Sequence, residues 1–114
     1  MRVYAVDINA AQRETLGLTA TEEGVLTRLR LWYLWTERPL PDDWRWIYAI
    51  AGVDQSAPYA ERQAVANVVQ RFFVYVKRDG GHVWVRREYD DLIAASHAAA
   101  TGQRTGGADD ANSA

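Results

Sequence analysis

The stretch from residue 18 to residue 43 constrains the fold most, because it holds the strongest helix signals and the densest apolar surface. Thr19 and Glu22 have the spacing of a capping box, in which a Thr hydroxyl accepts a helix amide and a Glu carboxylate returns to the amide of the cap. The prolines of Pro39-Leu40-Pro41 cannot continue a helix. We therefore expect a central helix that stops near Glu37 and is followed by a turn over residues 38–43.

A rotation of about 100° per residue divides the apolar side chains of this helix between two faces. The broader face holds Val25, Leu26, Leu29, Trp32 and Tyr33. The second face holds Leu31, Leu34 and Trp35. Surface helices usually show one apolar stripe, so two apolar faces indicate that something packs on both. Either the two ends of the chain cover the second face or another protein does.

Length and composition predict one ordinary globular domain. The chain has 114 residues, of which 48% are hydrophobic and 25% charged, which suffices to bury a core without covalent crosslinks. It has no cysteine, which excludes disulfides, thiolate catalysis and cysteine metal sites. Nothing in it resembles a signal peptide or a membrane span, so we expect a cytoplasmic location and no membrane partner.

The remaining patterns predict five further elements and a tail. A short N-terminal strand is expected through Val3–Ile8, a second helix over residues 43–51 closed by Gly52, and a third, amphipathic helix over residues 59–73. Two β-rich runs around Asp79-Gly80 predict a hairpin, and a last helix is expected from residue 88 to about residue 99. We expect residues 1–100 to form the domain and residues 101–114 to form a disordered polar tail.

This order of elements is that of a winged helix. The expected fold class is mainly α with a small β-hairpin: a winged helix-turn-helix with a short N-terminal strand and a C-terminal helix. The second and third helices would form the helix-turn-helix, the third would be the recognition helix, and the hairpin would be the wing.

A series of short motifs also resembles the YdaU-like proteins of phages and prophages, a family of uncharacterised function. The resemblance rests on Glu22-Glu23-Gly24, Leu31-Trp32-Tyr33-Leu34 and Pro39-Leu40-Pro41-Asp42-Asp43, and then on Val68–Phe73, Asp79-Gly80 with Trp84, and Arg86-Arg87. Such proteins look like the N-terminal winged-helix part of phage replication-initiation proteins. The resemblance implies DNA binding near a phage origin or a role in bringing in a helicase. The tail departs from the family pattern, because it keeps only Arg104 where the family is rich in Lys and Arg.

Charge is distributed unevenly along this acidic chain. Residues 60–87 carry six Lys or Arg and two acidic residues, although the whole chain has a formal net charge of −2. The cations of this segment would neutralise phosphates, and its Gln and Asn side chains could pair with adenine edges in the major groove. The predicted DNA-binding residues are Arg62, Gln63, Asn67, Gln70, Arg71, Lys77, Arg78, His82, Arg86 and Arg87. The alternative interpretation is that the polar face of the third helix and the hairpin tip are merely solvated.

Two of the tryptophans indicate a protein-interaction surface. Trp32 and Trp44 lie on predicted core faces, whereas Trp84 could be core or rim. Trp35 and Trp46 point away from the core positions. Exposed large aromatics with Leu neighbours mark contact surfaces, so the predicted protein-interaction residues are Leu31, Leu34, Trp35 and Trp46.

The sequence shows little that is typical of an enzyme active site. His82 and His97 are the only histidines, and neither belongs to a spaced set of metal ligands. We therefore expect no catalytic residues, no metal, no cofactor and no small-molecule substrate.

The lead hypothesis is a phage or mobile-element protein that binds double-stranded DNA in replication initiation or its control. The alternative is a protein-interaction or dimerisation module of a phage replication complex, which would use the Trp/Leu surface without touching DNA. Its partner would be a replication protein or a second copy of the chain.

Overall fold

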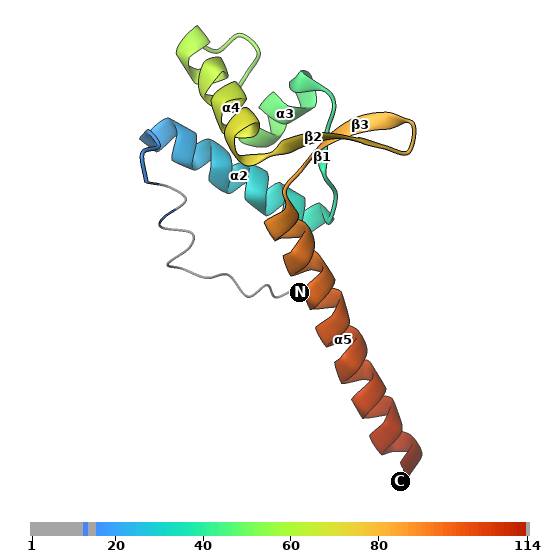
Figure 1. Cartoon of the computed structure of the whole chain (residues 1–114). Helices are drawn as coiled ribbons and strands as arrows, with labels where there is room; N and C mark the ends of the chain where they lie inside the picture. The colour runs from blue at the N-terminus through green and yellow to red at the C-terminus, as the bar shows by residue number, and fades with distance from the viewer. Residues whose placement is uncertain (1–12, 14–15, 114) are drawn as a thin grey trace.

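Four helices and a three-stranded antiparallel sheet make up the described part of the protein. The structure, a computed structural model, describes residue 13 and residues 16–113, with side chains up to residue 101. The elements, labelled as in Figure 1, are α2 (Ala20–Thr36), β1 (Leu40–Pro41), α3 (Trp44–Ala51), α4 (Tyr59–Phe72), β2 (Val74–Arg78), β3 (Gly81–Val85) and α5 (Arg87–Ser113). The predicted N-terminal strand Val3–Ile8 lies outside the described residues. Within the described part, no helix is both long and apolar enough to cross a membrane.

The central helix begins as its local sequence predicts. The Thr19 hydroxyl accepts the Glu22 amide at 3.1 Å, and the Glu22 carboxylate accepts the Thr19 amide at 3.0 Å. The helix stops at Thr36, and Glu37 takes a left-handed conformation with φ 55°. The capping box and the predicted helix end are both confirmed.

Helix α2 is central because α3, α4 and α5 all pack on it. In Figure 1, α3 and α4 lie above α2, and α5 starts at its C-terminal end and runs downward. The predicted core face is confirmed: Val25, Leu26, Leu29 and Tyr33 are buried, and Trp32 packs against the same cluster. Burial of this apolar face stabilises the packing of the helices.

Helix α3 has the predicted ends. Asp43 accepts the Arg45 amide at 3.0 Å as the N-cap, and Gly52 closes the helix in the left-handed region with φ 74°. A Cβ at position 52 would lie 2.9 Å from Nη1 of Arg28. Glycine is therefore favoured here both by backbone conformation and by space.

We expect Gly52→Ala to lower the free energy of unfolding by about 1–2 kcal/mol, because an L side chain is strained in the left-handed region. The matched control is Gly24→Ala within α2, where an added Cβ meets nothing within 4 Å. This control should stabilise by about 1 kcal/mol through helix propensity. Urea denaturation of both variants measures the difference, and equal effects would contradict this account of Gly52.

The sheet has the order β1-β3-β2, and its strand β1 is not predicted by the sequence. The hairpin itself is confirmed. Arg78 pairs with Gly81, and the two-residue turn Asp79-Gly80 has positive φ at both positions, as the right-handed twist of a hairpin favours. The added strand is β1, in which Leu40 pairs with Trp84. Leu40 is fully buried, so the predicted turn over residues 38–43 also contributes an edge strand.

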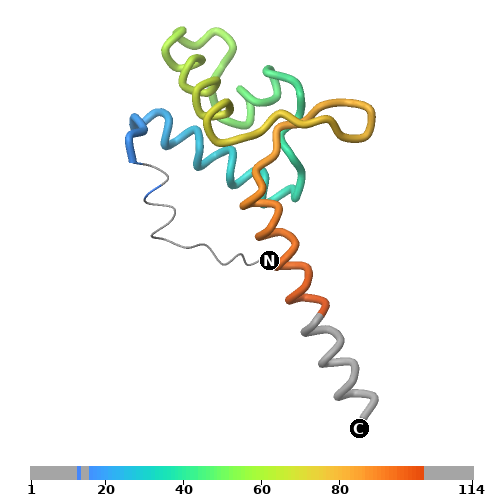
Figure 2. The backbone as a smooth tube through the Cα atoms, in the orientation of Figure 1, coloured from blue at the N-terminus to red at the C-terminus, as the bar shows by residue number. Residues whose placement is uncertain are grey.

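Helix α5 runs away from the other helices after packing on α2 (Figure 2). Tyr89 is buried in the core, and Leu92 and Ile93 pack against it. The terminal helix therefore covers part of α2, a point that the sequence left open between the chain ends and another protein. The helix continues past Ala99, where the sequence predicts its end. The division into a domain of residues 1–100 and a tail of residues 101–114 stays a prediction.

Candidate nucleic-acid interface

The solvent-facing side of α4 carries a row of uncharged polar side chains, which we call the α4 ridge: Gln63, Asn67 and Gln70. The opposite side of the helix is buried through Ala64, Val65, Val68 and Val69, which turns this row outward. Asn67 and Gln70 are exposed and Gln63 is half-buried. The Gln63 amide donates to Oδ1 of Asn67 at 2.9 Å, so these two side chains form one fixed pair of hydrogen-bonding groups.

Two arginines flank the α4 ridge. Arg62 is half-buried and donates from Nε to the Ala57 carbonyl at 3.1 Å, close to the start of the helix. Arg71 is exposed in the last helical turn, with its guanidinium 5.1 Å from the ring centre of Phe72. A cation at this end also complements the helix dipole. Of the two, Arg71 has the more accessible charge.

The hairpin follows α4 after the single residue Phe73 and projects from the body (Figure 1). Lys77 and His82 are cross-strand partners near its tip, and both are exposed. Side chains of directly paired residues lie on the same face of a sheet. Arg78 instead approaches α5, where a nitrogen of its guanidinium lies 3.7 Å from Oδ2 of Asp90. Lys77 makes no ion pair with any described residue, so its charge is available to a phosphate.

Arg86 has a structural setting. Its side chain is only 14% exposed and pairs with Glu88 at 2.8 Å. Its guanidinium lies 5.3 Å from the ring centre of Phe72 and 4.9 Å from that of Tyr89, and Nη1 donates to the Phe72 carbonyl at 3.5 Å. Arg86 thus joins the end of α4 to the start of α5. Its predicted phosphate contact has no support in this geometry, whereas the neighbouring Arg87 is exposed.

We expect Arg86→Ala to destabilise the protein by about 2 kcal/mol, because it removes a charge-assisted hydrogen bond and two ring contacts at a helix junction. Arg87→Ala removes the same charge from an exposed position and should change stability by less than about 0.5 kcal/mol. Thermal or urea unfolding of the two variants measures this contrast. Equal stabilities would show that Arg86 is as solvated as Arg87.

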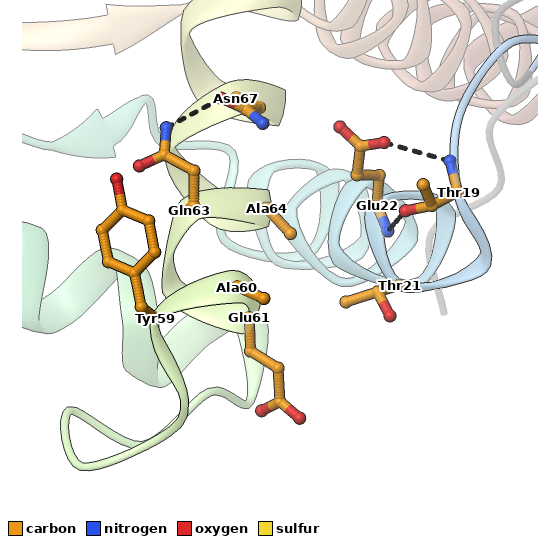
Figure 3. Close-up of a pocket in the computed structure, with 9 residues that line it drawn as sticks. All are labelled: Thr19, Thr21, Glu22, Tyr59, Ala60, Glu61, Gln63, Ala64 and Asn67. Atoms are coloured by element: carbon orange, nitrogen blue, oxygen red, sulfur yellow. Dashed lines mark hydrogen bonds between the residues drawn. The ribbon is translucent and has the colours of Figure 1, made fainter.

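A hollow of about 500 Å³ lies beside the ridge, between the start of α2 and the first half of α4. Figure 3 shows Thr21 and Glu22 on one side of it and Ala60, Glu61 and Ala64 on the other. Glu22 and Glu61 make this end of α4 acidic. A phosphate backbone would be repelled here, so the charges favour contact through the C-terminal half of α4, around Asn67, Gln70 and Arg71.

The second face of α2 is only partly exposed. Leu31 is 61% and Trp35 78% exposed, but Leu34 is buried at 6%. The prediction of Leu34 as a surface contact is therefore wrong. Leu34 belongs to the same buried cluster as Tyr89 of α5, which packs on α2. Trp46 on α3 is 60% exposed, in line with its predicted outward position.

The aromatic side chains of the sheet form a feature that the sequence reasoning missed. Trp84 contacts Trp44 and Tyr75, with ring centres 5.9 and 5.0 Å apart, and Tyr75 stacks on His82 at 4.7 Å. The Tyr75 hydroxyl donates to Oδ2 of Asp42 at 2.7 Å, and this hydrogen bond raises the pKa of Tyr75. Strand alternation, counted from the Asp79-Gly80 turn, would have placed the rings of Tyr75, His82 and Trp84 on one face of the hairpin.

The histidines lie apart. His82 is in the hairpin, whereas His97 of α5 pairs with Glu37 at the end of α2. Among the described residues, no group of three or more His, Cys, Asp or Glu side chains is arranged to hold a metal ion.

The fold and these surfaces define a mainly helical protein with a small antiparallel sheet and a polar helix face next to an exposed hairpin. Residues 3–94 match the family described as "Protein of unknown function (DUF1376)", and the chain belongs to this family. The comparisons found no match among the curated proteins or the solved structures.

Proposed function

We propose that this protein is a winged helix-turn-helix protein that binds double-stranded DNA. In this proposal α3 and α4 form the helix-turn-helix, the α4 ridge enters the major groove, and the β2–β3 hairpin is the wing. The observation that carries the proposal is the α4 ridge itself. It presents hydrogen-bonding groups that suit base edges, and it leads from Arg71 directly into a hairpin that bears Lys77.

The geometry reduces the set of cations that would contact phosphate. Arg71, Lys77 and Arg87 are exposed, whereas Arg86 is engaged at the helix junction and Arg78 lies near Asp90. Arg62 donates its Nε–H to the protein backbone. We propose that phosphate contacts of Arg71, Lys77 and Arg87 position the protein on the duplex and that Asn67 and Gln70 contact the bases.

A role in phage or mobile-element replication rests on the resemblance to YdaU-like proteins described above. Membership of the DUF1376 family leaves this role open, because the description of that family assigns no function. The double-stranded DNA would then lie at an origin or at a control site of replication.

Titration of a fluorescent duplex of about 20 base pairs, at a series of salt concentrations, tests the proposal. With about three phosphate contacts, log K should fall with log[salt] with a slope of about −3. Anisotropy measures both affinity and slope. Absence of binding to any duplex at the lowest salt concentration would contradict DNA binding.

The second candidate function is protein interaction through Leu31 and Trp35 on α2 and Trp46 on α3, favoured by the exposure of these three large side chains. Tryptophan is among the residues enriched in protein interfaces. Trp35→Ala should then abolish self-association or partner binding in sedimentation while leaving the melting curve unchanged. A wild-type protein that stays monomeric and binds no replication protein would contradict this candidate.

A further inference from the structure

One face of the sheet carries a continuous row of aromatic rings that ends near the hairpin tip. The row runs from Trp44 through Trp84 and Tyr75 to His82. Its last two rings are parallel within 6°, with centres 4.7 Å apart. Toward its inner end the row joins the core, because Trp44 and Trp84 pack against the buried cluster. The outer rings, Tyr75 and His82, are therefore attached to rings that the core holds in place.

The outer end of the row is open. Tyr75 is 45% exposed and His82 is exposed. The residues that precede His82 are Gly80 and Gly81, and a Cβ built on either one meets nothing within 4 Å. Gly80 and Gly81 themselves have no side chain that could cover the exposed His82 ring. A further flat ring would extend the stack there.

One hydrogen bond and one nearby cation favour the binding of a nucleotide at this site. The hydrogen bond from the Tyr75 hydroxyl to Asp42 fixes the ring on which His82 stacks, so little side-chain freedom would be lost on binding. Lys77 lies directly across from His82 on the same face and has no ion-pair partner among the described residues. A flat ring next to an unpaired cation matches a nucleobase with its phosphate.

We propose that this face of the wing binds single-stranded nucleic acid, with an unpaired base stacked on His82 and an adjacent phosphate on Lys77. Aromatic platforms beside cations are the usual means of holding single strands, because every base has a face that can stack. A base inside a duplex is stacked on both sides and cannot reach His82 unless it leaves the helix. Asp42 lies at the Tyr75 hydroxyl, so the backbone should run from His82 toward Lys77 and away from that carboxylate.

This site goes beyond the proposed duplex binding, since it uses the sheet face and needs none of the α4 ridge. Of the residues that the proposed function assigns to phosphates and bases of the duplex, this site uses only Lys77. A protein with both sites would hold a duplex through α4 and an unpaired strand through the wing. The edge of a melted region of DNA presents a duplex and an unpaired strand side by side. Variants of His82 and of Gln70 therefore separate the two activities.

The experiment uses the full chain and a fluorescent oligothymidylate of about 12 nucleotides, next to an abasic chain of the same length. Wild-type protein should bind the thymidylate at least about tenfold more tightly than the abasic chain, since one stacked base accounts for such a factor. His82→Ala should remove most of this preference, and His82→Phe, which keeps a ring, should retain it. Melting curves check that both variants fold.

Equal affinity for the two oligomers, or an unchanged preference in His82→Ala, would overturn the inference. Gln70→Glu is the complementary variant, and it should weaken duplex binding while leaving thymidylate binding unchanged. Wild-type protein that binds the thymidylate but no duplex would contradict the proposed function alone, whereas wild-type protein that binds the duplex without preferring the thymidylate would overturn this site alone.

Discussion

Tyr33→Ala is expected to lower the free energy of unfolding by about 4 kcal/mol, as for other buried aromatic residues cut back to Ala. Tyr33 is fully buried at the centre of the core, where its ring lies 5.4 Å from Tyr89 and 6.2 Å from Phe73. Its hydroxyl donates to Oδ1 of Asp90 at 2.6 Å. One side chain therefore connects the central helix, the end of α4 and the start of α5.

Tyr33→Phe isolates the hydrogen bond and should cost about 2 kcal/mol, because the acceptor is a charged carboxylate in a partly buried site. Burial and the Asp90 carboxylate both raise the pKa of Tyr33, which keeps the hydroxyl protonated as a donor. The control is Tyr75→Phe, which removes an equally short bond to Asp42 at an exposed site. It should have a much smaller effect in urea denaturation. Equal losses in the two Phe variants would contradict the central role of Tyr33.

The double variant Arg71→Ala with Lys77→Ala should have the largest effect on DNA binding. Removal of two phosphate contacts should reduce the slope of log K against log[salt] by about 2. At low salt this corresponds to a loss of affinity of at least about tenfold. Both side chains are exposed, so the variant should fold normally.

The matched control for charge is Arg28→Ala with Arg38→Ala. These two arginines are also exposed, but they belong to the central helix and the connection after it. The control changes the net charge by the same amount and should leave the salt slope unchanged. If both double variants reduce the affinity equally, the binding follows net charge and not the α4 ridge and wing.

Much of the fold was predictable because its signals are local. The capping box of Thr19 and Glu22, the cap at Asp43 and the turn at Asp79-Gly80 each depend on a few neighbouring residues. The amphipathic pattern of α4 likewise predicted its buried side. These features hold the same positions in the structure because no distant contact overrides them.

Features that depend on distant partners were missed. Strand β1 forms because Leu40 pairs with Trp84, which lies far along the chain. The prolines on either side of Leu40 predict a turn instead of a strand. Leu34 is buried in a cluster that includes Tyr89 of α5, a helix that packs on α2. Neither event has a local signature.

The sequence predicted which kinds of side chain face outward at the candidate site better than it predicted the contacts of each residue. Helical periodicity places Gln63, Asn67 and Gln70 on the outer face of α4. In the structure Asn67 and Gln70 are exposed there, and Gln63 is half-buried. The role of Arg86 could not be predicted from the sequence, because the contacts of its guanidinium with Phe72, Glu88 and Tyr89 depend on the folded structure. Adjacent arginines therefore have different environments, one at a helix junction and one in solvent.

The duplex affinity of Gln70→Glu, compared with that of Ala98→Glu, tests the central claim most directly. Both variants add one negative charge at an exposed helical position, the first on the α4 ridge and the second on α5. If the α4 ridge enters the major groove, Gln70→Glu should weaken duplex binding by at least about tenfold, because it sets a carboxylate among base edges and phosphates. Ala98→Glu should bind within about twofold of wild type. Equal affinities of the two variants would contradict the claim that α4 is the DNA-recognition helix.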